Sequence, residues 1–153
     1  MKVWLLLHLV GVVLFVGNII TAAFWKVRAD LQENPVVIHH TVKNVMLADF
    51  VFTLPGLILV IISGIAMAVQ AEMPLLGLNW LTLSLFLFAV TGVVWLAILL
   101  PLQHALIRHS AACIESGSIS KAYSQASHLW AVFGIIATLL PVIIFYLMIT
   151  ISF

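Results

Sequence analysis

The residues best suited to chemistry in this chain are six histidines, and they are distributed unevenly along it. His8 lies alone inside the first long apolar stretch. The other five histidines lie near those ends of the later stretches that are expected on the opposite side of the membrane. Neutral imidazole binds iron, copper and zinc, and a neighbouring acceptor such as a carboxylate fixes its tautomer. This distribution favours a cofactor or metal site built from histidine.

Two of these histidines fall at matching depth, because His104 and His128 lie just beyond the third and fourth apolar stretches. Asp49, directly before the second stretch, is expected at the same depth. Lys26 and Arg28, at the end of the first stretch, are expected there too. Two facing histidines in a four-helix bundle are typical of a bis-His haem b, and two cations suit its propionates. We therefore expect these five residues to form one cofactor-binding layer, with Asp49 orienting an imidazole.

The remaining histidines, His39, His40 and His109, form a second tier further from the membrane centre. Imidazole-rich sites hold soft or borderline metal ions, so this tier, with Met46, predicts a metal site with copper as its occupant. The alternative interpretation is that interfacial histidines only contact lipid headgroups and water. Five histidines on one side leave both interpretations open.

His8 has no charged neighbour on its own stretch, so its partner must come from another helix. Either it ligates haem or a metal, or one hydroxyl or amide group satisfies it. The side chains at a suitable depth are Ser63, Gln70, Thr82, Ser84, Tyr146 and Thr150.

Composition identifies the surroundings of these residues as a membrane. Apolar residues make up 65% of the 153-residue chain and charged residues only 7%, whereas soluble domains have about half and about a quarter. A net charge of +1 provides no basic surplus for nucleic acid, which we exclude as a partner. The single Cys113 excludes a disulfide framework.

Four apolar stretches are long enough to cross a bilayer as helices, which takes about 20 residues each. They cover residues 3–25, 50–69, 80–102 and 129–151. None alternates apolar and polar residues, as a membrane β-barrel strand would. The sequence therefore predicts an all-α, four-helix transmembrane bundle that forms a single domain.

The connections predict helices longer than the membrane is thick. Asn34 is a good N-cap and Pro35 suits the first helical position, and an uninterrupted helix from there through Val69 would be roughly 50 Å long. In the third connection a break at residues 116–118 separates two helical segments. We expect helices two, three and four to extend past the cytoplasmic face.

Charge sets the expected orientation, because short cytoplasmic loops carry an excess of lysine and arginine. The first and third connections contain five such residues, whereas Lys2 is the only one on the other side. Both termini are therefore predicted to lie outside the cytoplasm, in a bacterial inner membrane.

Small and polar residues line one face of each of the first two helices. On the first helix this face includes Gly11 and Asn18, and on the second Asp49, Thr53 and Gly56. Such stripes allow helices to pack closely in lipid. Proline within three of the spans, at residues 55, 101 and 141, predicts kinks.

Several segments resemble a bacterial family of predicted integral membrane proteins of unknown function. The resemblance covers most of the first 110 residues and rests on motifs at residues 7–18, 25–30, 48–56, 63–64 and 95–103.

That family is distantly similar to HemJ-type protoporphyrinogen oxidases and to CopD-type copper-resistance membrane proteins. The shared feature is a first helix with an early histidine, a mid-helix glycine and a later arginine, matched here by His8, Gly17 and Arg28. The early histidine of HemJ-type enzymes is implicated in haem binding, so the resemblance implies that role for His8. The lysine and histidine that HemJ-type enzymes carry in their third helix are missing from residues 80–102.

The leading expectation is a small haem-binding membrane protein with a redox or haem-handling role, which includes a haem-dependent oxidoreductase. It would act with a membrane redox partner or as a homo-oligomer. A copper-binding or copper-transporting protein and a non-catalytic accessory subunit are the alternatives. No motif for nucleophilic catalysis or phosphate binding is present.

Overall fold

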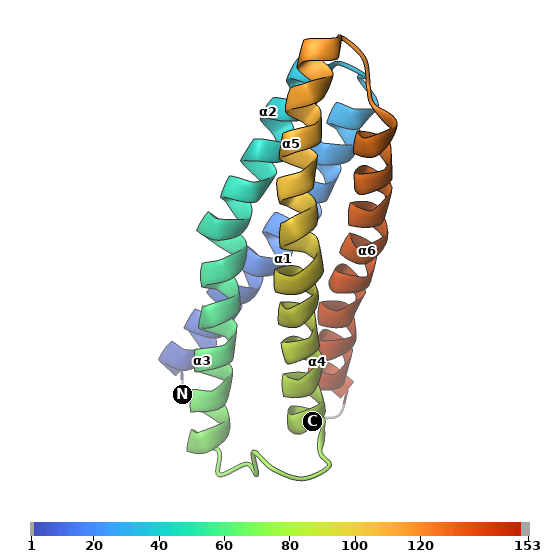
Figure 1. Ribbon diagram of the computed structural model, residues 1–153. Coiled ribbons are helices and arrows are strands. Elements are labelled where there is room, and N and C mark those ends of the chain that lie inside the picture. The colour runs from blue at the N-terminus through green and yellow to red at the C-terminus, as the bar shows by residue number, and fades with distance from the viewer. Residues whose placement is uncertain (1, 151–153) are drawn as a thin grey trace.

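Four long helical rods make up the protein, and the computed structural model describes residues 2–150 (Figure 1). The first and fourth rods are single helices, whereas the second and third each contain a short π-helical segment. Their elements are α1 (Lys2–Asp30), α2 (Pro35–Ala48), η1 (Asp49–Thr53), α3 (Leu54–Gln70), α4 (Trp80–Val94), η2 (Trp95–Leu99), α5 (Leu100–Ser116) and α6 (Lys121–Thr150). All four rods are long and apolar enough to cross a membrane, which confirms the predicted all-α bundle.

The predicted start of the second rod is confirmed. The Asn34 side chain accepts a hydrogen bond from the Val36 amide at 3.0 Å, and Pro35 occupies the first turn. From there the helix continues for 36 residues to Gln70. The predicted break in the third connection is Gly117, whose left-handed φ of 70° ends α5.

Both π-helical segments directly precede a proline in the first turn of the next helix. The Leu54 amide bonds to the Asp49 carbonyl, and the Leu100 amide to the Trp95 carbonyl, so each bond spans five residues instead of four. Proline cannot donate an amide hydrogen bond and crowds the carbonyl four residues back, and a wider turn relieves that crowding. The distortion predicted at Pro55 and Pro101 therefore takes the form of π turns.

The closest helix contact is between α1 and α3, and two glycines permit it. A Cβ at Gly56 would lie 2.7 Å from the Phe15 backbone nitrogen, and one at Gly11 would lie 2.9 Å from the Gly56 carbonyl oxygen. No side chain fits at such distances. The small-residue stripes predicted from the sequence thus meet at this crossing.

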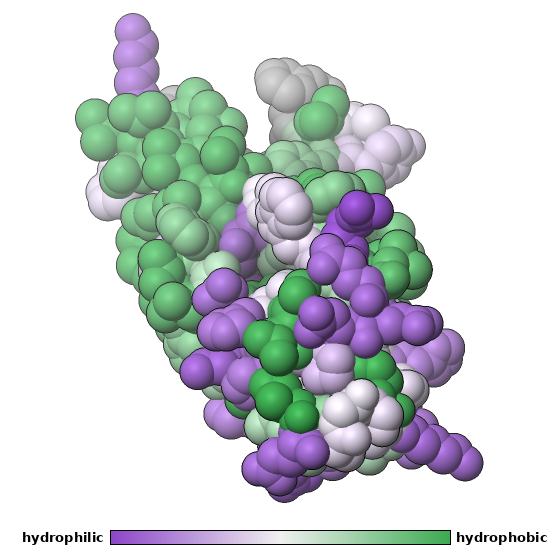
Figure 2. All heavy atoms as spheres, turned by 90° about the horizontal axis from the view of Figure 1, so that it is seen from above, coloured by the Kyte–Doolittle hydropathy of each residue, from purple (hydrophilic) through white to green (hydrophobic). Residues whose placement is uncertain are grey.

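One end of the bundle is polar, and the flanks are apolar. Viewed along the bundle, hydrophilic side chains gather at the end where the α1–α2 and α5–α6 connections lie (Figure 2). The predicted extensions of the helices form this end. Apolar residues exposed on the flanks, such as Val13, Phe86 and Ile149, are typical of a lipid-facing surface.

Candidate functional site: a buried carboxylate between two cavities

Asp49 is the centre of a buried polar cluster that joins three of the rods. Its Oδ1 accepts hydrogen bonds from Asn18 Nδ2 at 3.0 Å and from Thr53 Oγ1 at 2.8 Å. Its Oδ2 accepts from Gln103 Nε2 at 2.5 Å and, at a long 3.4 Å, from Trp95 Nε1. Since Asp49 and Trp95 each begin a π-helical segment, the two wide turns face each other at this cluster.

No cationic side chain compensates the Asp49 carboxylate, although only 6% of the residue is exposed. Within residues 2–150 the single ion pair joins Lys26 to Asp30 instead. The Gln103 side chain is equally buried, and its Oε1 has no hydrogen-bond partner. The cluster therefore combines an uncompensated carboxylate with an unsatisfied carbonyl oxygen, and both are costly in apolar surroundings.

A cavity of about 440 Å³ lies beside this cluster, between α1, α3, α4 and α6. This volume is typical of pockets for small organic ligands. Its walls are mainly aliphatic and aromatic, and its polar groups are few. The lining residues that carry polar side-chain atoms are Asp49, Thr53, Thr91, Trp95, Gln103, Trp130 and Thr138.

The cavity opens toward the surrounding lipid between α1 and α6. Ile20 and Val27 on α1 line it and are 57% and 51% exposed. Ile135 and Leu139 line it from α6 and are 61% and 55% exposed. Because these wall residues also form the outer flank, a ligand dissolved in the bilayer can reach the cavity without crossing water.

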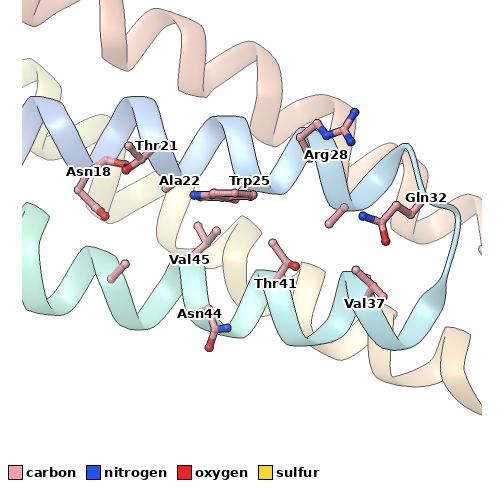
Figure 3. A pocket seen from close by; sticks show the side chains of 12 residues that line it. Asn18, Thr21, Ala22, Trp25, Arg28, Gln32, Val37, Thr41, Asn44 and Val45 are labelled. Carbon is pink, nitrogen blue, oxygen red and sulfur yellow. The ribbon is translucent and has the colours of Figure 1, made fainter.

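A second cavity, of about 450 Å³, lies between α1 and α2 on the other side of Asn18 (Figure 3). In the close-up, the Trp25 ring lies between the two helices, with Asn18 near one end of the cavity and Gln32 near the other. Arg28, which we expected at a propionate, is exposed on its rim. Asn18 lines this cavity and donates to Asp49, so its amide separates the polar cavity from the apolar one.

Lys26, the second cation expected at a propionate, is instead bound within the protein. It is 2% exposed and pairs with Asp30 Oδ2 at 2.5 Å, and it also donates to Ser127. The Tyr123 hydroxyl donates to Asp30 Oδ1 at 2.6 Å, and the Lys26 ammonium lies 5.4 Å from the Tyr123 and Trp130 ring centroids. This arrangement joins α1 to α6 and occupies the donors of Lys26.

His8 finds its partner on α3. Its Nδ1 lies 3.1 Å from both the Val60 carbonyl oxygen and the Ser63 hydroxyl. Ser63 is among the partners expected from depth, whereas the Val60 carbonyl was not expected. The space beside His8, lined also by Phe15 and Pro141, has a volume of about 20 Å³.

His104 and His128 do not join Asp49. Both are exposed, and His104 Nδ1 bonds to the Leu100 carbonyl of its own helix at 2.9 Å. Each residue turns an α-helix by about 100°, so His104 points away when its neighbour Gln103 points inward. His128 lies midway between the buried Ala126 and Trp130, and therefore on the opposite face.

The three histidines of the outer tier also do not come together as a metal centre. His39 Nδ1 lies 2.9 Å from Ser110 Oγ, and the His39 and His40 ring centroids are 6.4 Å apart. His109 is half-buried on α5. Across residues 2–150 no group of three or more His, Cys, Asp or Glu side chains is placed to hold a metal ion.

The sequence interpretation missed Gln103 and Trp95 as partners of Asp49. The sequence contains a signal for them, because Trp95, Leu99 and Gln103 are spaced four residues apart. In the structure all three are buried. Such spacing indicates one helix face, and a glutamine on that face requires polar partners in the bundle interior.

The fold and this site define an integral membrane protein with four helical spans and a buried polar cluster. The chain belongs to the family described as predicted integral membrane protein (DUF2269), whose sequence profile matches residues 2–151. The function of this family is unknown. No curated protein and no solved structure matches the chain, so the comparisons give no support to the distant similarity to HemJ-type or CopD-type proteins.

Proposed function

We propose that this protein binds a small, mainly apolar ligand that enters from the lipid and docks its polar group near Asp49. The observation that carries this proposal is the cavity of about 440 Å³ with mainly apolar walls and the Asp49 cluster on one side. Ligand sites usually combine such walls with a few polar groups that fix the orientation of the ligand.

The position of the opening supports this proposal. The exposed wall residues Ile20 and Ile135 belong to α1 and α6, so the ligand enters between these helices. The Lys26–Asp30 pair and its bond to Ser127 hold the two helices together at the polar end. The two helices are thus fixed at the polar end of the bundle and open on the flank at the level of Asn18 and Asp49.

Photolabelling tests the proposal. The protein is placed in phosphatidylcholine nanodiscs with an eight-carbon alcohol that carries a diazirine, and labelled residues are mapped by mass spectrometry. We expect labels on the walls of the cavity, and a severalfold loss of these labels in Gly134→Leu. Gly134 lines the cavity, and a Cβ there would meet nothing within 4 Å, so we expect the longer side chain to extend into the cavity.

Gly92→Leu is the matched control. A Cβ at Gly92 also meets nothing within 4 Å, but Gly92 does not line the cavity. Labelling of the cavity walls should stay at the wild-type level in this variant. Labels confined to the lipid-facing flanks in the wild type would overturn the proposal.

Haem b at His8 is the second candidate, and the His8 side-chain geometry favours it. The bond between Nδ1 and the Val60 carbonyl orients the ring and leaves Nε2 as the ligating nitrogen, as in many haem and metal sites. The space of about 20 Å³ beside His8 does not accommodate a porphyrin, so the residues as arranged do not fit this group.

An absorption spectrum tests this second candidate. If haem b is bound at His8, protein purified from haem-supplied cells shows a Soret band that His8→Ala removes. His104→Ala and His128→Ala should retain the band, because both side chains are exposed on the outside of their helices. A flat spectrum of the wild-type protein would dismiss haem.

A further inference from the structure

We infer that the ligand of the apolar cavity is a cationic amphiphile, an apolar chain with a protonated amine that docks between the Asp49 carboxylate and the unpaired Gln103 Oε1. This inference rests on the proposed function and adds the chemical class of the ligand. It follows from the carboxylate of Asp49 and from the shortage of free hydrogen-bond donors around it.

The partners of Asp49 leave its charge without a cation. All four hydrogen bonds to the carboxylate come from neutral groups, namely two amides, a hydroxyl and an indole. An ionised carboxylate without a cation is unfavourable in apolar surroundings, and an opposite charge within a few ångströms stabilises it. The cavity beside Asp49 is the space where a cation can supply that charge.

Most side-chain donors among the polar groups that line the cavity are already bonded to an acceptor of the protein. Thr91 donates to the Leu87 carbonyl and Thr138 to the Gly134 carbonyl, and the other such donors all bond to Asp49. The indole N–H of Trp130 and the second N–H of Gln103 Nε2 are the exceptions.

The cavity therefore presents mainly acceptors to its ligand, and a ligand must donate. The Gln103 amide group uses one N–H of Nε2 on Asp49, and its buried Oε1 has no donor. An ammonium group has three N–H donors. One can bond to this oxygen, and another can replace the 3.4 Å contact from Trp95, which is the weakest bond to Asp49. Carboxylates, phosphates and simple ketones offer only acceptors and do not match.

The other charged groups of the region leave this preference unchanged. Lys26 approaches Trp130, but its charge is balanced by Asp30 at 2.5 Å. Arg28 lies on the rim of the other cavity. The aromatic rings of Phe15 and Trp95 line the apolar cavity and add attraction for a cation.

A pair of matched photoprobes tests this inference. An eight-carbon primary amine and the corresponding alcohol, with the diazirine at the same carbon, are compared in phosphatidylcholine nanodiscs at pH 7. We expect the amine to label the cavity walls roughly tenfold more than the alcohol, relative to labelling of the lipid-facing flanks, because charge-assisted hydrogen bonds are about twice as strong as neutral ones. In Asp49→Asn the ratio should fall to about one.

Glu72→Gln is the matched control, because it removes an exposed carboxylate from the α3–α4 connection and should leave the ratio unchanged. Equal labelling by the two probes in the wild-type protein would overturn the inference and leave the proposed function intact. Absence of cavity labels with both probes would instead overturn the proposed function. The wild-type ratio decides the inference even if Asp49→Asn fails to fold.

Discussion

Asp49 and Asp30 show two ways of placing a carboxylate in apolar surroundings. Asp30 is paired with a lysine that is 2% exposed, and its oxygens also accept hydrogen bonds from Tyr123 and Ser127. Asp49 has only neutral donors and borders a cavity. A fully paired charge is suited to holding helices together, whereas an uncompensated charge beside a cavity is suited to binding a ligand.

Removal of Lys26 from its pair with Asp30 should destabilise the protein. Lys26→Met leaves Asp30 without its cation, and because the Asp30 side chain is 28% exposed we expect a loss of about 1.5–3 kcal/mol, the range for a hydrogen bond to a charged group. Thermal unfolding in mild detergent measures the effect, with Lys43→Met as a control at an exposed lysine. The double variant Lys26→Met/Asp30→Leu should recover most of the loss. Equal melting temperatures for Lys26→Met and the wild type would contradict the role of the pair.

The sequence predicted the depth of the polar residues better than their direction. Ser63 was expected as a partner of His8 because both lie at the same level of the bundle, and the structure pairs them at 3.1 Å. His104 was placed at the correct level beside Asp49, but Gln103 occupies the inward position. Position along the chain gives the height of a residue in a membrane helix, whereas its direction depends on small rotations that π turns alter.

At the scale of elements, the α1–α3 crossing and the paired π turns determine where the polar cluster forms. The crossing requires glycine at 11 and 56, and the sequence predicted it from stripes of small residues. Proline residues at 55 and 101 indicated distorted helices, but nothing in the sequence specified a π turn rather than a kink. The two wide turns orient Asp49 and Trp95 toward each other, and both residues line the cavity.

Gly56→Ala should separate α1 from α3 and reduce stability. The new Cβ would lie 2.7 Å from the Phe15 backbone nitrogen, and overpacking of this kind costs typically 1–3 kcal/mol. Gly92→Ala introduces the same methyl group into open space and should not lower the melting temperature. The prediction fails if the two variants melt alike in detergent.

At the scale of the whole molecule, length and apolar content were sufficient to predict four spanning helices, and the structure confirms them. The cavity was not predictable, because it arises where side chains from four helices fail to fill the space between them. The orientation of the bundle in the membrane stays a prediction from lysine and arginine in the connections.

Cysteine labelling tests this orientation. In a Cys113→Ser background, single cysteines are introduced at the exposed positions Leu76 and Ser118, which lie in connections at opposite ends of the bundle. A membrane-impermeant maleimide added to spheroplasts should label Leu76→Cys and not Ser118→Cys, because the connection containing Ser118 is predicted to be cytoplasmic. Labelling of Ser118→Cys alone would reverse the orientation.

The central claim, that the apolar cavity holds a ligand, is tested most directly by mass spectrometry of an organic extract. Wild-type protein and Gly134→Leu are purified from the native membrane in mild detergent and extracted in parallel. We predict a small molecule, near equimolar with the wild-type protein and carrying a basic nitrogen, that is depleted severalfold in Gly134→Leu. Identical extracts from both proteins, containing only bulk lipid, would contradict the claim.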